Sequence, residues 1–248
     1  RATGPTASTS MDVKIGMKKD GTITAAAVNF RMQGGAFFGM SPIGEALSCA
    51  LACYNIPAVH HEGYEVLANR PKAAAYRAPG SPMAAFAVES LIDEMAHELA
   101  LDPLALRLKN AAHEGTKSSY GPTYDRIGLV ESLEATMAHP NLLVPLGPNQ
   151  GRGSAGGFWF NHGGETSVSL AIGEDGTVTV SVGTPDIGGS RASIALMTAE
   201  CLGIAYENVR VNVVETGALG VNEPTHGSRA TFASGMAAVE AARQAIKT

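Results

Sequence analysis

One tetrapeptide whose residue types could bind a ligand occurs twice in this sequence. The first copy is Gly189-Ser190-Arg191-Ala192 and the second is Gly227-Ser228-Arg229-Ala230. Glycine lets a ligand approach the backbone, serine offers a hydroxyl donor, and arginine offers a planar fork that suits phosphate. At the start of a helix, unpaired N–H groups and the positive end of the helix dipole add to this preference for anions. Two such sequences favour a long anion, such as the pyrophosphate of a dinucleotide cofactor.

A purely structural interpretation of the two copies stays open. Serine is a favoured N-cap residue and glycine is a favoured loop residue, so helix capping alone explains either copy. Neither copy belongs to a G-x-x-x-x-G-K-[ST] loop or to a Rossmann fingerprint. The sequence also lacks a G-x-S-x-G elbow and an H-E-x-x-H motif, which argues against hydrolase and metalloprotease functions.

A lone arginine in a turn is a further candidate. Arg77 lies in AAYRAPGSP, residues 74–82, between small residues and an apolar stretch. Turns favour proline and glycine but do not need arginine, which raises the question of what the Arg77 side chain contacts. The pair His60-His61 is a weaker candidate for a metal site, because adjacent side chains on a strand point to opposite faces. No side chain of this sequence is therefore predicted to be a metal ligand.

The composition argues against several classes of function. The net charge of −5 and the absence of a Lys/Arg run argue against a nucleic-acid partner. No stretch of about 18 apolar residues is present to form a membrane-spanning helix. The three cysteines, Cys49, Cys53 and Cys201, are too few and too scattered for a disulfide framework. They are interpreted as buried thiols in a reducing compartment, which favours a cytoplasmic location.

Two hairpins of similar design are predicted to precede these candidates. Residues 13–30 and 167–183 each contain Asp-Gly-Thr followed by alternating residues, which is typical of a β-hairpin with one buried face. The shared pattern suggests two similar halves, although short hairpins also resemble one another by chance.

Helices and one further strand are predicted to complete the chain. Ser81 and Asp102 each precede a proline, which predicts N-caps for helices over 81–99 and 104–115. Residues 141–153, rich in proline and glycine, are predicted to be an extended linker. The other predictions are helices over 129–140 and 236–247, a glycine-rich loop and helix over 184–204, and a strand over 208–216.

This order of elements predicts an α+β fold. We expect two similar α/β lobes, residues 1–145 and 146–248, each with a mixed or antiparallel sheet and packed helices.

The order of longer motifs points to a family. NFRMQGGAF is followed by a block over residues 54–110 that contains YNIPAVHHEGYEVLANRPKAAAYRAPGSPM and LALDPLALRLKN. GTPDIGGSRAS and EPTHGSRATFASGMAAVEAA come later. Together they resemble the large, molybdenum-binding subunit of the xanthine dehydrogenase and aldehyde oxidase family. The resemblance covers nearly the whole chain, and its domains imply the same two-lobed fold.

The resemblance implies an oxidoreductase of the molybdenum hydroxylase class. Such enzymes insert oxygen from water into a C–H bond of an aldehyde or an N-heteroaromatic ring. The implied cofactor is molybdenum bound by molybdopterin, in bacteria usually the cytosine dinucleotide form. The implied partners are an iron–sulfur subunit and often an FAD subunit in a hetero-oligomer, because electrons must leave the site. The chain itself has no cysteine pattern for a cluster.

The resemblance also assigns roles to individual residues. Arg77 and Ala78 occupy the turn that reaches the molybdenum centre in the family. Gly227, with Ser228 and Arg229, falls on a second cofactor loop. Gly188, Gly189 and Ser190, followed by Arg191, fall where the family usually has Gly-Gln-Gly beside the pterin. These residues are the expected cofactor-binding set, and Arg77 and Glu45 are the expected catalytic residues.

Several positions depart from the family pattern. Gly189 replaces a glutamine, Glu45 replaces a substrate-holding arginine of purine-oxidising members, and Pro79 replaces a stacking phenylalanine. The changes at Glu45 and Pro79 argue against xanthine as substrate, and Glu45 would suit a cationic or hydrogen-bond-donating ring. Ala78 stands where carbon monoxide dehydrogenases carry cysteine. The departures keep an alternative open, a non-catalytic relative that binds a cofactor or partner.

Two family motifs are not found in the chain. The resemblance places a GGGFG-type loop before Arg1 and a general-base glutamate after Thr248. We therefore expect the chain to be an internal part of a larger subunit and to be inactive alone.

Overall fold

The computed structural model describes residues 4–38 and 41–247. The chain divides into two compact units, Arg1–Trp159 and Phe160–Thr248. Within the described ranges, no helix combines the length and apolar character needed to cross a membrane.

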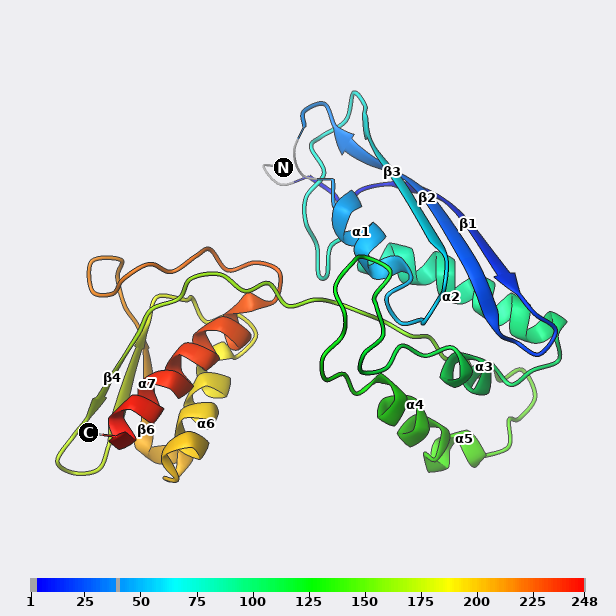
Figure 1. Cartoon of the computed structure of the whole chain (residues 1–248). Helices are drawn as coiled ribbons and strands as arrows, with labels where there is room; N and C mark the ends of the chain where they lie inside the picture. Colours follow the sequence, from blue (N-terminus) through cyan, green and yellow to red (C-terminus); the bar gives the residue numbers. More distant parts are fainter. Residues whose placement is uncertain (1–3, 39–40, 248) are drawn as a thin grey trace. The chain divides into compact units, whose positions relative to one another are not determined.

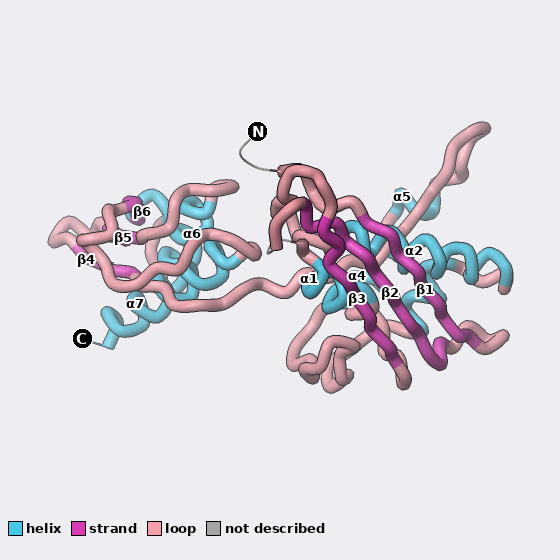
Figure 2. The backbone as a smooth tube through the Cα atoms, turned by 90° about the horizontal axis from the view of Figure 1, so that it is seen from above, coloured by secondary structure: helices cyan, strands magenta, loops and turns pink. Residues whose placement is uncertain are grey.

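The first unit begins with five elements: β1 (Thr9–Met17), β2 (Ile23–Gly35), α1 (Ile43–Ala50), β3 (Val59–Leu67) and α2 (Ser81–Glu98). β1 and β2 form the predicted antiparallel hairpin, and α1 connects β2 to a parallel β3, so the sheet order is β1-β2-β3 (Figures 1 and 2). Alternate residues of β2, such as Phe30 and Met32, are buried in one cluster with residues of α1 and α2. The hairpin turn is tied to the helices by Asn110, whose Oδ1 accepts from Ile23 N at 2.9 Å.

Three shorter helices complete the first unit: α3 (Pro103–Lys109), α4 (Leu129–Met137) and α5 (Pro140–Leu143). Asp102 is the N-cap of α3, as predicted, because its Oδ1 accepts from Ala105 N at 2.8 Å. Leu104 of α3 and Leu133 of α4 share a small separate cluster.

The second unit repeats the plan of the first. Its elements are β4 (Val168–Ile172), β5 (Val178–Val182), α6 (Ser190–Leu202), the 3₁₀ turn η1 (Tyr206–Asn208), β6 (Val209–Val213), the π-helical turn η2 (Ala230–Ser234) and α7 (Gly235–Lys247). β4 and β5 pair antiparallel, and α6 connects β5 to a parallel β6. Val178, Val180 and Val182 pack with residues of α6 and α7 on one face of the sheet.

The two units therefore share one topology, a hairpin, a helix, a parallel strand and a second helix. In this order α1 corresponds to α6 and α2 corresponds to α7. The prediction of two α/β lobes with mixed sheets is confirmed. The lobe boundary predicted at residue 145 stays a prediction, whereas the compact units divide after Trp159.

Three local expectations were wrong or incomplete. Ser81 is not an N-cap: Gly80, with φ of 82°, holds that position, and the Ser81 hydroxyl donates to Phe158 O instead. The predicted linker is not fully extended, because it contains the end of α5 and Arg152 donates to the carbonyl of Leu142. α1 and β3 were not predicted from the sequence, because α1 buries its inner face against β2 and α2, and β3 only packs Gly63 against Ile43 and Leu47.

Candidate functional site

The first glycine turn, residues 188–191, starts α6. Gly188 and Gly189 have φ of 63° and 79°, and a Cβ atom at either position would meet nothing within 4 Å. The backbone of this turn is thus open at the N-terminus of a helix of 13 residues.

Asp186 already satisfies part of this helix end. Its Oδ1 accepts from Arg191 N at 3.1 Å, and its Oδ2 accepts from Arg191 Nε at 2.9 Å. These bonds, the backbone N–H bond first, hold the pKa of Asp186 below its usual value. The Arg191 guanidinium is half exposed but is directed to a carboxylate of its own loop.

The second glycine turn, residues 227–229, precedes η2 and α7. Gly227 has φ of 55°, and a Cβ atom there would lie 2.0 Å from His162 Cδ2, so the position requires glycine. Ser228 also has a positive φ, 62°, which is costly for a residue with a side chain.

Arg229 is directed inward. Its side chain is 0% exposed, and its guanidinium donates to the carbonyls of Gly163 at 2.7 Å, Glu223 at 2.8 Å and Glu165 at 3.0 Å. Nη2 also donates to Thr166 Oγ1 at 2.7 Å. Each guanidinium nitrogen therefore has a protein acceptor. The Arg229 guanidinium, which the sequence predicted to suit phosphate, instead holds the loops of this unit together.

Both glycine turns lie at the same end of the second unit. Gly235 of α7 lies against Met197 of α6, and Cys201 Sγ donates to Val239 O, so both contacts join residues 38 positions apart. A constant offset means that α6 and α7 run parallel, as Figure 1 shows. A buried 2.8 Å hydrogen bond between Thr184 and Ser234 joins the segments that precede the two helices. The positive ends of two helix dipoles thus point the same way.

The Arg77 turn, residues 77–80, occupies the corresponding place in the first unit, just before α2. Arg77 and Ala78 have φ of 21° and 48°, unusual values for residues with side chains. Gly80 packs so closely that a Cβ would lie 2.5 Å from Pro42 O and 2.9 Å from Ala46. The Arg77 side chain is exposed.

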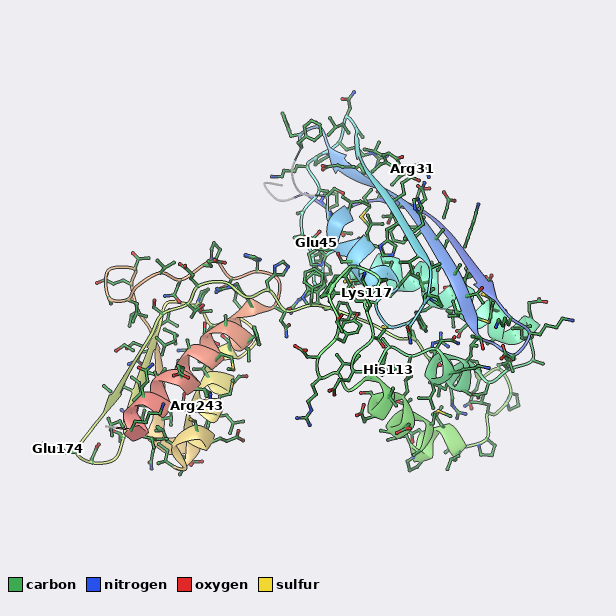
Figure 3. All side chains as sticks on the ribbon, viewed as in Figure 1. Arg31, Glu45, His113, Lys117, Glu174 and Arg243 are labelled. Atoms are coloured by element: carbon green, nitrogen blue, oxygen red, sulfur yellow. The ribbon has the colours of Figure 1, made fainter. Side chains whose placement is uncertain are left out.

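Glu45 lies in the first turn of α1 and is half-buried (Figure 3). Its neighbour Ala46 is the residue that contacts Gly80. The structure therefore places the two residues expected to be catalytic, Glu45 and Arg77, on adjoining segments of one unit.

A buried ion pair joins α2 to α3 and was not predicted from the sequence. Glu89 is 6% exposed, and its Oε2 accepts from Arg107 Nε at 2.7 Å. Tyr54 donates its hydroxyl to the same carboxylate, and burial, followed by the Glu89 charge, raises the tyrosine pKa. The available signal was Arg107 standing between Leu106 and Leu108 in an apolar helix.

The two cysteines of the first unit are poor nucleophiles and poor metal ligands. Burial is the main cause that raises the pKa of Cys49 to about 11 and that of Cys53 to about 12. Among the residues described, no group of three His, Cys, Asp or Glu side chains is arranged to hold a metal ion.

Comparison with known families matches each half of the chain to a cofactor-binding domain. Two distinct models, each described as a molybdopterin cofactor-binding domain, match residues 1–111 and residues 149–248. The chain therefore belongs to the molybdopterin cofactor-binding domains of the xanthine dehydrogenase and aldehyde oxidoreductase family.

Curated relatives and solved structures agree with this assignment. The aldehyde oxidoreductase of Megalodesulfovibrio gigas is 28% identical over 266 residues, covering 99% of this chain and 29% of the relative. The xanthine dehydrogenase molybdenum-binding subunit of Escherichia coli O157:H7 is 28% identical, covering 82% of this chain and 29% of the relative. The structure of the Desulfovibrio gigas aldehyde oxidoreductase superposes with a TM-score of 0.82 at 25% identity, covering 98% of this chain and 29% of that one. The chain thus spans about 30% of the length of these relatives.

The observed backbone suits an anionic cofactor better than the arginine side chains do. The first glycine turn is open where a Cβ would project, and two helix N-termini face one end of the second unit. Arg191 and Arg229 are both engaged within the protein. The residues present fit a phosphate-bearing group at the open backbone of Gly188 and Gly189, since the next two N–H groups are already bonded, that of Ser190 to Ile187 O and that of Arg191 to the Asp186 carboxylate.

Proposed function

We propose that this chain forms part of the catalytic subunit of a molybdenum hydroxylase that acts on an N-heteroaromatic or aldehyde substrate, with water as the oxygen source. The observation that carries the proposal is the pair of cofactor-domain matches together with the exposed glycine backbone at the start of α6. The names of the relatives, an aldehyde oxidoreductase and a xanthine dehydrogenase subunit, support the two substrate classes.

Residues of each unit have separate roles in this proposal. The open backbone of Gly188 and Gly189, with Ser228 of the second glycine turn, holds the phosphates of a molybdopterin cytosine dinucleotide. Ser190, whose N–H donates to Ile187 O, fixes the start of α6 behind them. The Arg77 turn, with Ala78, approaches the metal-bearing part of the cofactor. Bound molybdenum would supply the redox chemistry of C–H hydroxylation, and partner subunits with iron–sulfur clusters and FAD would accept the electrons.

Glu45 has a proposed role in substrate choice. Its carboxylate is half-buried beside the segment that carries Arg77, where a negative charge favours a cationic or hydrogen-bond-donating ring. A protonated N-heterocycle has both properties.

A second candidate is a non-catalytic relative that binds a cofactor or a partner. It is favoured by Gly189, which offers no side-chain donor, and by Arg191 and Arg229, whose donors are used within the protein. Such a protein would keep the fold and lose the reaction.

Oxygen transfer from water distinguishes the two candidates. The full-length subunit, purified with its partner subunits, would be incubated in H₂¹⁸O with quinoline, nicotinate, xanthine and benzaldehyde and an artificial electron acceptor. The hydroxylase predicts a product carrying ¹⁸O from at least one substrate, detected by mass spectrometry, and a Glu45→Ala variant with a changed ranking of substrates. An absence of labelled product from protein that contains molybdenum would favour the non-catalytic relative. An unchanged ranking would rule out the role of Glu45.

A further inference from the structure

The chain between α5 and the end of the first unit is fixed at three points. We call residues 144–159 the connecting segment. Arg152 donates to the carbonyls of Asn141 and Leu142 at 2.7 and 2.9 Å, which folds the segment back onto α5. Gly156 N donates to Glu89 Oε2 at 2.6 Å, and Phe158 O accepts from Ser81 Oγ at 2.7 Å. The segment therefore lies along α2 rather than acting as a free linker.

Glu89 is a rigid anchor for this segment. Its carboxylate is buried and also accepts from Arg107 and Tyr54. Arg107 is itself 1% exposed and donates through Nη2 to the Glu89 carbonyl. A buried charge with this many partners cannot move without breaking several of them, so the position of Gly156 is set by the core of the unit.

Ser81 connects the segment to the Arg77 turn. It is the first residue of α2, and its N–H donates to Ala78 O at 3.0 Å, which closes the turn. Positive φ at Arg77 and Ala78 costs energy, and such a conformation persists only where surrounding contacts hold it. Two contacts do so here, the packing of Gly80 on Pro42 and Ala46, and the bond from Ser81 to Phe158.

We propose that the connecting segment is a clamp that holds the Arg77 turn in its binding conformation, with Ser81 and Glu89 as positioning residues. This inference rests on the proposed function, because it assigns the Arg77 turn to the cofactor. Neither residue is proposed to touch the cofactor, since each acts through the segment. The clamp explains why the Ser81 hydroxyl, at a helix start, bonds to a carbonyl 77 residues away instead of capping its own helix.

The test removes one hydroxyl. Ser81→Ala would be compared with Ser90→Ala, a matched change on the exposed side of the same helix, in the full-length subunit purified with its partners. Backbone hydrogen exchange by mass spectrometry would follow residues 76–81 and 156–159. We expect exchange in both segments to rise about tenfold in Ser81→Ala, as for one lost hydrogen bond, and to stay unchanged in Ser90→Ala. We also expect a lower molybdenum content and a broadened Mo(V) signal in electron paramagnetic resonance.

Two results would overturn the clamp. One is exchange in both segments equal to that of Ser90→Ala. The other is faster exchange with a molybdenum content and Mo(V) signal identical to wild type, which would show that the segment does not position the cofactor turn. Failure of the proposed function looks different, because wild-type protein would then give no labelled product or contain no molybdenum, while the exchange comparison would still report whether Ser81 fixes the turn.

Discussion

Two arginines that lie in the same tetrapeptide, Gly-Ser-Arg-Ala, have opposite surroundings in this protein. Arg191 and Arg229 each follow Gly-Ser and precede Ala, so the sequence gives no reason to treat them differently. In the structure Arg191 lies at the surface and pairs with Asp186, whereas Arg229 is buried among loop carbonyls. Two of the carbonyls that surround Arg229 belong to residues 66 and 64 positions earlier, so only the folded chain reveals its role.

The difference predicts unequal effects of one substitution. Arg229→Met would leave several partly buried carbonyls without this donor, at about 0.5–1.5 kcal/mol each, so the free energy of unfolding should fall by more than about 1.5 kcal/mol. Arg191→Met would remove one exposed ion pair and should cost less than about 1 kcal/mol. Thermal denaturation of cofactor-free protein measures both. Equal stability of the two variants would show that Arg229 does not hold the loops and would favour a direct contact between Arg229 and the cofactor.

Elements with strong local signals were predictable, and elements made by packing were not. The two Asp-Gly hairpins, the N-cap at Asp102 and most helices follow from turn and capping residues. β3 contains His60, His61 and Glu62 and shows little alternation, because its inner face is defined by α1, with Gly63 against Ile43. The anchors of the connecting segment, Glu89 and Ser81, likewise depend on partners far away in sequence.

The first hairpin has a pH-dependent turn. Asp20 accepts from Thr22 N at 3.0 Å, the main cause that lowers its pKa from 3.8 to about 2, with a contribution from Lys109. Because the folded-state pKa is lowered, the turn adds stability above pH ~4 and loses it as pH falls towards ~2. The melting temperature of wild type should exceed that of Asp20→Asn at pH 6, and the gap should narrow between pH ~4 and ~2. A gap that stays constant over this range would contradict the account.

At the scale of the molecule, the chain consists of two units with one topology and with candidate ligand contacts at equivalent places. The Arg77 turn precedes α2, and the second glycine turn precedes α7, the corresponding helix. The shared Asp-Gly-Thr hairpins hinted at this repeat, and the parallel pairing of β2 with β3 and of β5 with β6 establishes it. The candidate residues were found from glycine, serine and arginine patterns, but the direction of each arginine side chain was not predictable from them.

Cofactor content is the measurement that tests the central claim most directly. The full-length subunit would be purified with its partner subunits from a host that makes the molybdenum cofactor. Metal would be measured by elemental mass spectrometry, and nucleotide would be released with acid and identified. The account predicts close to one molybdenum and one CMP per subunit. Folded protein that contains neither would contradict the assignment of the glycine turns and the Arg77 turn to a molybdopterin cofactor.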